Sequence, residues 1–210
     1  MICVSVAEPD LERCREVLSA CQLAELRIDQ TAFSATELQE LFALPVDLVA
    51  TCRPGARSEA QRASLLLTAI AAGAAYVDIE ADADADLVRR VSQGARDHGC
   101  QLIISHHDPA RTPQLSELEE ILARCSRVGA DIVKIVCRAQ SAADCARLLS
   151  LYQREQRIIA FSLGSAWTFT RVAAHFLGAP FTYAAWAPGA ATADGQLDLR
   201  RMERVLDALR

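Results

Sequence analysis

Short apolar runs recur along the whole chain, and each is followed by a stretch in which apolar positions have helical spacing. The runs begin roughly 25 residues apart, which is the length of one strand plus one helix. We predict eight strands, over Ile2–Val6, Ala24–Asp29, Val46–Arg53, Tyr76–Glu80, Gln101–His107, Asp131–Cys137, Arg157–Leu163 and Phe181–Trp186.

The segments between these runs have the pattern of amphipathic helices. In residues 109–128 apolar side chains return every three or four positions, and the first and last segments show the same spacing. Gly73, Gly99 and Gly129 stand where a helix would give way to the next strand. Glycine is favoured there because helices often end in a left-handed conformation.

Eight strand–helix units in one chain predict an α/β fold built on a parallel sheet with helices outside it. The usual closed form is the (β/α)₈ TIM barrel, here a single compact domain over residues 1–210 with short loops. An open doubly wound sheet is the alternative. It is disfavoured because neither GxGxxG nor GxxxxGK[ST] follows an early strand.

Composition narrows the set of partners. The chain is 51% hydrophobic and carries a net charge of −5, whereas nucleic-acid binding needs clustered positive charge. No apolar run approaches the roughly 20 residues of a membrane span, and no basic leader is apparent. The eight cysteines stand singly, without CxxC or zinc spacing. We therefore expect reduced thiols, no metal site and a cytoplasmic protein that binds neither nucleic acid nor membrane.

One basic residue differs from all the others. Of the 22 lysines and arginines, only Lys134 is a lysine, and it lies within the apolar run Ile132–Val136. A lysine at a strand end could reach water or a carboxylate, but arginine would serve there equally well. Only lysine can lose its proton and attack a carbonyl, and burial favours the uncharged amine. We predict that Lys134 is a nucleophile.

Polar side chains stand two residues apart on several consecutive strands, so each set shares one face. These sets are Glu25, Arg27 and Asp29; Thr51 and Arg53; Asp78 and Glu80; and Ser105 and His107. Ion pairs that only fill a barrel interior would give the same pattern. Its repetition favours a charged site for a small anionic substrate at the carboxyl ends of the strands. His106 and His107 face opposite ways, and strand parity does not decide which of them faces the site.

In order and approximate spacing, these segments resemble type I 3-dehydroquinate dehydratases, and the resemblance covers essentially the whole chain. It rests on Glu25–Asp29, Thr51–Pro54, Asp78–Glu80, Ser105–Asp108, Ile132–Ile135, Gly164, Thr170, Arg171 and Thr192–Gln196. The resemblance implies a TIM barrel that dehydrates 3-dehydroquinate to 3-dehydroshikimate in the shikimate pathway, without metal or cofactor. Family members are often dimers, so a homodimer is one expectation.

The resemblance also implies roles for single residues. Lys134 matches the Schiff-base lysine, His107 the catalytic histidine and Arg171 the arginine that holds the substrate carboxylate. The other matches to substrate-binding positions are Glu25, Arg27, Arg53, Thr192 and Gln196. The small-residue stretch 187–196 is predicted to close over bound substrate.

The chain departs from the family pattern after the third strand. The Glu-Gly-Gly that commonly follows the arginine is missing, and residues 53–59 read RPGARSE. Glu59 is the candidate to replace that glutamate, which normally supports the histidine. Thr192 stands where serine is usual and keeps the hydroxyl. Two other functions stay open: a Schiff-base class I aldolase, and a catalytically impaired homologue that binds ligands.

Overall fold

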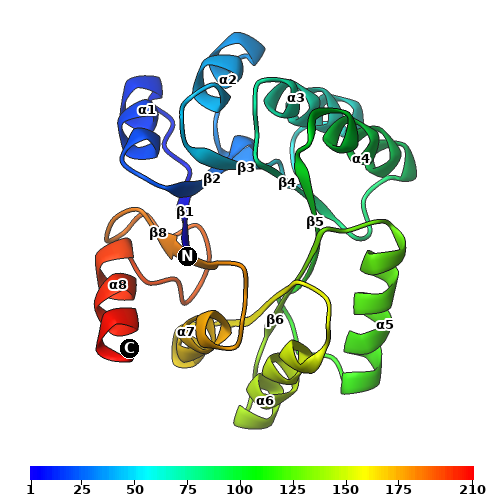
Figure 1. The fold of residues 1–210 in the computed structure, drawn as a ribbon, viewed down its shortest axis with the longest axis vertical. Coiled ribbons are helices and arrows are strands. Elements are labelled where there is room, and N and C mark those ends of the chain that lie inside the picture. The colour runs from blue at the N-terminus through cyan, green and yellow to red at the C-terminus, as the bar shows by residue number, and fades with distance from the viewer. The chain divides into compact units, whose positions relative to one another are not determined.

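The computed structural model describes residues 1–210, along which strands and helices alternate (Figure 1). The strands are β1 (Ile2–Val6), β2 (Leu23–Arg27), β3 (Asp47–Thr51), β4 (Tyr76–Glu80), β5 (Gln101–Asp108), β6 (Ile132–Arg138), β7 (Ile158–Leu163) and β8 (Thr182–Ala185). The α-helices are α1 (Leu11–Ser19), α2 (Ala35–Phe42), α3 (Glu59–Ala71), α4 (Ala85–His98), α5 (Leu115–Arg127), α6 (Ala142–Ser150), α7 (Phe169–Phe176) and α8 (Leu199–Ala208). Three 3₁₀ helices are η1 (Ile28–Gln30), η2 (Leu151–Gln153) and η3 (Ser165–Trp167).

All eight strands belong to one sheet, in the order β7-β6-β5-β4-β3-β2-β1-β8. From β1 to β7 each strand neighbours the next along the chain, and β8 lies beside β1. A doubly wound sheet would instead reverse its strand order at an internal switch point. The sequential order and the alternation with eight helices confirm the predicted (β/α)₈ barrel class.

The chain divides into two compact units, residues 4–103 and residues 104–210 together with residues 1–3. The division cuts through β1 and β5 rather than between elements. A single domain over residues 1–210 stays a prediction. In unit 4–103, β2 and β3 pair in parallel from Leu23↔Asp47 to Arg27↔Thr51, and β4 continues the sheet. Helices α2, α3 and α4 pack side by side over apolar side chains such as Leu66 and Ile79, which are fully buried.

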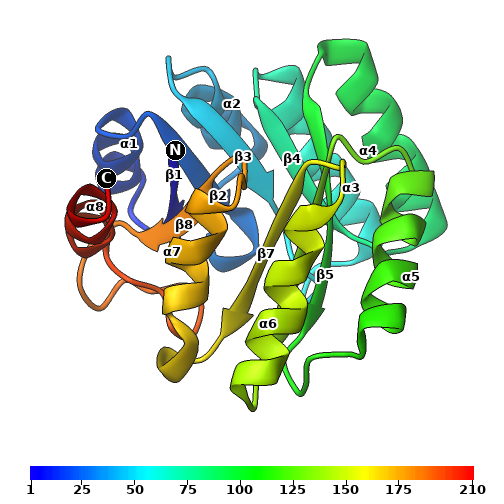
Figure 2. The same cartoon turned by 60° about the horizontal axis from the view of Figure 1, so that its bottom comes forward.

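In the other unit, β6 and β7 pair in parallel from Val133↔Ile158 to Arg138↔Leu163. Helices α6 and α7 both pack against β7 (Figure 2). A separate apolar cluster joins α7, β8 and α8, through Val172, Ala184, Met202 and Leu206. Residues on both faces of β6 and β7 are buried, so their sequences read as continuous apolar runs.

Three helices begin after a serine whose side chain caps the first turn. Ser34, Ser58 and Ser141 each accept a hydrogen bond from the backbone N–H three residues later, and the side chain at that position bonds back to the serine N–H. This reciprocal pair satisfies two N–H groups that a helix start leaves without partners. The glycines predicted at helix ends, Gly73, Gly99 and Gly129, all have positive φ.

The cysteines are in the reduced state that their spacing in the sequence predicts. All eight cysteines are free thiols and seven are buried, as predicted. Burial raises the pKa of Cys14 to about 12 and that of Cys52 to about 11, so these thiols stay protonated at neutral pH. None of the helices combines the length and apolar character that crossing a membrane requires.

Strands β2 and β3 each end two residues earlier than predicted. Strand β2 stops at Arg27, and η1 turns the chain so that the Asp29 carboxylate accepts from Arg27 Nε and Nη2 at 3.0 and 2.6 Å. Asp29 therefore does not continue the alternation of Glu25 and Arg27. Strand β3 stops at Thr51, and the carbonyl of Cys52 accepts from Arg62 Nε at 2.8 Å. Arg53 consequently lies in the loop after the strand.

Side chains accept hydrogen bonds from the backbone N–H groups at the edge of strand β7. Strands β7 and β8 stand at the two ends of the sheet order, so no ladder of hydrogen bonds joins them. The N–H of Ala160 donates to the Tyr152 hydroxyl at 2.7 Å, and the N–H of Ser162 donates to Thr170 Oγ1 at 2.9 Å. Thr170 Oγ1 in turn donates to the carbonyl of Trp167 at 2.7 Å. Two hydroxyls thus replace the missing neighbouring strand.

We expect Thr170→Val to lower the free energy of unfolding by about 1–3 kcal/mol, because a buried N–H and a half-buried carbonyl each lose a partner while the side-chain volume is kept. Thr170→Ser retains the hydroxyl and should cost less. Urea denaturation of both variants measures the difference. Equal stability of Thr170→Val and the unmodified protein would show that the hydroxyl does not support this edge.

Candidate active site

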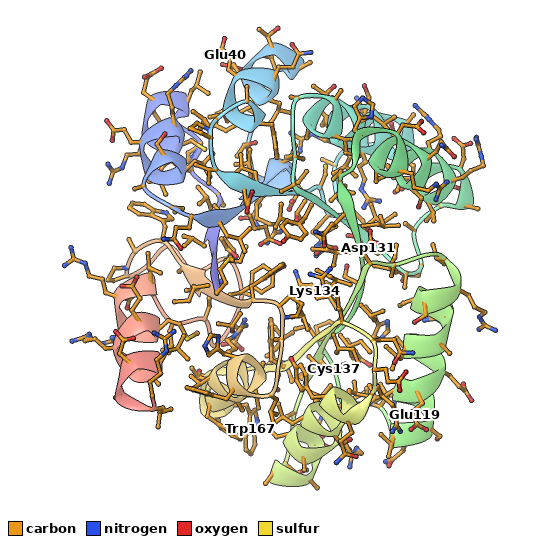
Figure 3. All side chains as sticks on the ribbon, in the orientation of Figure 1. Glu40, Glu119, Asp131, Lys134, Cys137 and Trp167 are labelled. Carbon is orange, nitrogen blue, oxygen red and sulfur yellow. The ribbon has the colours of Figure 1, made fainter.

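Lys134 lies in the middle of β6, as predicted, and is buried with 5% of its surface exposed. It pairs with Ile159 of β7, and its neighbours on β6 are buried as well. Lys134 and Cys137 are both labelled in Figure 3, and their odd separation along the strand places them on opposite faces. The only primary amine of a side chain in this protein is therefore held inside the sheet.

Two cations of the unit formed by residues 1–3 and 104–210 lie over aromatic rings. The Lys134 Nζ lies 4.1 Å from the ring centroid of Tyr183 on β8. The guanidinium carbon of Arg171 lies 4.2 Å from the ring centroid of Phe161 on β7. The Phe161 and Tyr183 rings are themselves in contact, with centroids 6.0 Å apart. A cation over an aromatic face gains electrostatic stabilisation, which is largest where water is excluded.

Arg171 comes from the first turn of α7 and is 1% exposed. Its Nη2 donates to the carbonyl of Asp194 at 3.2 Å. Its own carbonyl accepts from Thr182 Oγ1 at 2.8 Å, which ties α7 to the start of β8. A guanidinium held in this way is pre-oriented, because an aromatic ring of β7 and a backbone carbonyl of the β8–α8 loop both contact it.

The loop between β8 and α8 is tied to the start of α7. The N–H of Gly164 donates to the carbonyl of Asp194 at 3.4 Å, and Thr168 Oγ1 donates to the carbonyl of Gly195 at 3.0 Å. Gly195 has a φ of 75°, and a Cβ there would lie 2.4 Å from the carbonyl oxygen of Gly164. Only glycine permits this close approach.

Within that loop, the predicted binding residues Thr192 and Gln196 contact each other. Gln196 Oε1 accepts from the Thr192 N–H at 2.9 Å and from Thr192 Oγ1 at 3.3 Å. Asp194 also forms an ion pair with Arg138 at the end of β6, at 3.2 Å. The stretch 187–196 is therefore a bonded loop in this structure, and its closure over substrate stays a prediction.

His107 lies near the carboxyl end of β5 with its side chain exposed, whereas His106 is half-buried. Asp108, the last residue of the strand, accepts from the N–H groups of Ala110 and Arg111, both at 2.9 Å. This Asx-type turn fixes the point where β5 ends. An exposed imidazole at a strand end is accessible to a ligand that enters from solvent.

A second group of charged side chains lies in unit 4–103, at the carboxyl ends of β2, β3 and β4. Glu25 is buried and accepts from Ser5 Oγ at 2.9 Å and from Thr51 Oγ1 at 3.0 Å. Ser5 is the β1 partner of Glu25 in the sheet, whereas Thr51 lies two residues beyond Val49, the β3 partner of Glu25. The two hydroxyls offset part of the cost of burying a carboxylate.

Arg53 is held by two carboxylates of β4. Its Nη2 donates to Asp78 Oδ2 at 2.7 Å and its Nη1 to Glu80 Oε1 at 2.8 Å. Burial disfavours the charged form of this guanidinium, but the nearby charges of Asp78, Glu80 and Glu25 outweigh it and raise the pKa of Arg53 above its usual range. Arg53 is thus a permanent, oriented cation. For this strand pair the structure contains the ion pairing that the sequence left as an alternative.

Arg62 was not among the predicted site residues, yet it organises this group. Its side chain is fully buried, with Nε on the carbonyl of Cys52 and Nη2 on Glu80. Glu80 therefore bridges Arg53 and Arg62. A signal for Arg62 was present in the sequence, because it shares the buried stripe of α3 with Leu66 and Ala69.

Glu59 begins α3 and contacts the same arginine. Both of its carboxylate oxygens accept from Arg62 Nη1, at 2.8 and 2.7 Å. Its side chain is 42% exposed. The role predicted for Glu59, support of His107, stays a prediction, as does a substrate contact for Arg27. The Arg27 guanidinium is paired with Asp29, and although burial opposes its charge, this pairing raises the pKa of Arg27.

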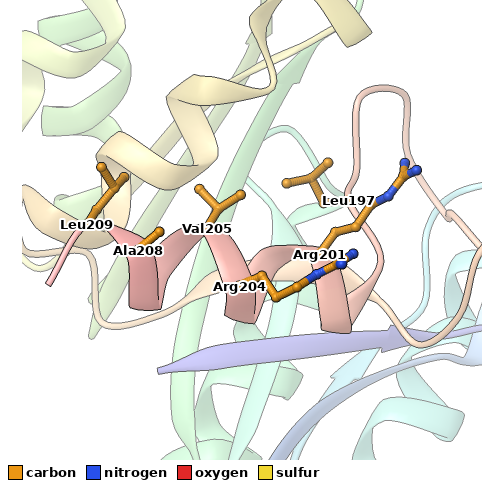
Figure 4. Close-up of a pocket in the computed structure, with 6 residues that line it drawn as sticks. All are labelled: Leu197, Arg201, Arg204, Val205, Ala208 and Leu209. Atoms are coloured by element: carbon orange, nitrogen blue, oxygen red, sulfur yellow. The ribbon is translucent and has the colours of Figure 1, made fainter.

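A hollow of about 400 Å³ lies on α8 (Figure 4). It is lined by Leu197, Arg201, Arg204, Val205, Ala208 and Leu209. The lining is mostly apolar and includes none of the predicted site residues. We therefore do not assign the active site to this hollow, since the active sites of this fold lie at the carboxyl ends of the strands.

Comparison with known proteins identifies the family. Its sequence model, described as type I 3-dehydroquinase, matches residues 2–210. A 3-dehydroquinate dehydratase from Desulfotalea psychrophila is 31% identical, over 97% of this chain and 96% of that protein. The structure of the type I 3-dehydroquinate dehydratase from Clostridium difficile has a TM-score of 0.86 at 21% identity, covering 99% of this chain and 91% of that one. The 3-dehydroquinate dehydratase structure from Aquifex aeolicus has a TM-score of 0.83 at 26% identity, covering 99% and 98%. The chain belongs to the type I 3-dehydroquinase family.

Proposed function

We propose that this chain dehydrates 3-dehydroquinate to 3-dehydroshikimate through a Schiff base on Lys134, with His107 as the general acid and base. One observation carries the proposal: the only lysine is buried in mid-strand on β6, with its amine over an aromatic ring. Family membership supplies the substrate. A homodimer, a cytoplasmic location and a role in aromatic amino acid biosynthesis accompany the proposal.

The first step joins enzyme and substrate. The Lys134 amine adds to the C3 ketone, the carbinolamine loses its oxygen as water, and a protonated carbon–nitrogen double bond remains. This iminium draws electrons from the neighbouring C2–H bond. Loss of the C2 proton then gives a neutral enamine instead of a free carbanion, which lowers the barrier to proton removal.

His107 moves the protons. As a neutral imidazole it accepts the C2 proton, and it then protonates the C1 hydroxyl so that water leaves and the C1–C2 double bond forms. General acid–base catalysis of this kind typically contributes about 10²–10⁴-fold. Hydrolysis of the product iminium returns the amine of Lys134. The scheme uses no metal and no cofactor.

Arg171 would bind the substrate carboxylate, because a planar guanidinium matches two carboxylate oxygens better than an ammonium does. Its burial over Phe161 and its bond to the β8–α8 loop support this assignment. The further residues proposed to contact substrate are Glu25, Arg27, Arg53, Thr192 and Gln196, and Glu59 is proposed to support His107. Arg53 is oriented by two carboxylates and suits hydrogen bonding to a substrate hydroxyl or carboxylate.

A catalytically impaired, ligand-binding homologue is the second candidate. The missing Glu-Gly-Gly after Arg53 favours it, and so does the contact of both Glu59 carboxylate oxygens with Arg62. A class I aldolase would use the same enamine chemistry to break a carbon–carbon bond. Product analysis with 3-dehydroquinate and with phosphorylated sugars separates the three functions, since only the dehydratase releases a conjugated ketone from 3-dehydroquinate.

We expect borohydride added during turnover of 3-dehydroquinate to fix an adduct on Lys134, which peptide mass spectrometry locates. Lys134→Arg keeps the positive charge but cannot form an imine, so it should give neither adduct nor product. An adduct on the N-terminal amine instead of Lys134 would rule out the proposed nucleophile.

We expect His107→Ala to form the borohydride-fixed adduct as the unmodified protein does, but to release product about 10²–10⁴-fold more slowly, because only proton transfer is removed. His106→Ala is the matched control on the neighbouring residue and should keep most of the activity. Single-turnover and steady-state rates measure both effects. Full activity of His107→Ala would exclude His107 from the reaction.

A further inference from the structure

The Tyr183 ring, which lies under the amine of Lys134, contacts two other buried aromatic rings. Tyr183 contacts Phe161 at a centroid distance of 6.0 Å and Phe181 at 5.6 Å, in tilted and edge-on geometries. All three rings are at most 2% exposed. Such packing fixes the plane of the Tyr183 ring, because each neighbour restricts its rotation. The face that it presents to Lys134 is therefore held by the core and not by solvent.

We infer that Tyr183 is a positioning residue for the Lys134 amine, and that Phe161 holds the Arg171 guanidinium in the same way. The inference rests on the proposed function. Each cation lies about 4 Å from a ring centroid, and the two rings touch. The aromatic pair is thus a rigid spacer between the nucleophile and the carboxylate-binding group.

The need for such a spacer follows from the lysine side chain. Four rotatable carbon–carbon bonds separate its nitrogen from the backbone, and ordering a chain of this length costs entropy. A flexible amine spends little time aimed at a carbonyl, whereas a pre-oriented one gains rate without a further contact. The ring face attracts a positive nitrogen. It therefore suits both the ammonium form and the iminium that replaces it, since both carry positive charge.

The spacer also defines a class of substrate. A ligand must present a ketone to the amine over Tyr183 and an anionic group to the guanidinium over Phe161 at the same time. Neither ring can move without displacing the other or Phe181. We expect 2-oxo and 3-oxo acids whose two groups have a different separation to bind without forming an imine.

The single lysine allows a direct test of the geometry without substrate. Protein labelled only with ¹³C,¹⁵N-lysine gives one lysine side-chain spin system, that of Lys134. A ring facing Nζ at 4.1 Å should shift the ε-methylene protons upfield, and Tyr183→Leu should remove this shift whereas Tyr183→Phe keeps it. An unshifted signal in the unmodified protein would overturn the inference, and this measurement needs no variant to fold.

The chemical role is tested by the rate at which borohydride fixes the 3-dehydroquinate adduct in a single turnover. Tyr183→Leu should slow this rate about tenfold, and Tyr183→Phe should stay within about twofold, because the ring face and not the hydroxyl holds the cation. Phe42→Leu on α2 is the control for the loss of an equally buried ring elsewhere in the core. Phe161→Leu should mainly raise KM, whereas Tyr183→Leu should mainly lower kcat.

The outcomes separate this inference from the proposed function. If the unmodified protein forms the adduct and Tyr183→Leu forms it as fast as Tyr183→Phe, the positioning role is wrong and the Schiff-base reaction stands. If Phe42→Leu slows adduct formation as much as Tyr183→Leu does, the effect is general packing and the role is again wrong. If the lysine signal is ring-shifted but no adduct forms with 3-dehydroquinate, the proposed function fails and the positioning role falls with it.

Discussion

A primary amine that is buried in a parallel sheet loses its hydrating water, and other groups must then stabilise its charge. In this protein the face of Tyr183 lies against the Lys134 nitrogen, and the same arrangement recurs with Phe161 and Arg171. Burying a cation is costly unless fixed charges, dipoles or ring faces compensate. Strands β6, β7 and β8 and helix α7 each supply one cation or one ring to these contacts.

The two groups of charged residues use different solutions to the same problem. In unit 4–103 the cations are balanced by carboxylates: Glu80 lies between Arg53 and Arg62, and Asp78 accepts a second bond from Arg53. Around Lys134 and Arg171 the described contacts are aromatic faces and a backbone carbonyl.

Much of the fold could be predicted because the repeat of strand and helix is long and regular; the strand bounds differ from those predicted by no more than two residues. The errors at β2 and β3 arise where side chains bond to nearby groups, Arg27 to Asp29 and Arg62 to the Cys52 carbonyl, and strand periodicity does not contain that information. Lys134 was found because it breaks an apolar run. Tyr183 and Phe161 break no pattern, since a buried ring in a buried strand looks like any other core residue, and their contact joins β7 and β8, which stand at opposite ends of the sheet order.

The seam between β7 and β8 has a further consequence. Tyr152 and Thr170 complete the hydrogen bonding of one side of that seam, so the sheet can part there without exposing backbone amides that nothing else satisfies. Phe161 lies on one side of the seam and Tyr183 on the other. The contact between their rings crosses a line that no ladder of hydrogen bonds closes, so side-chain packing limits any such parting of the two strands.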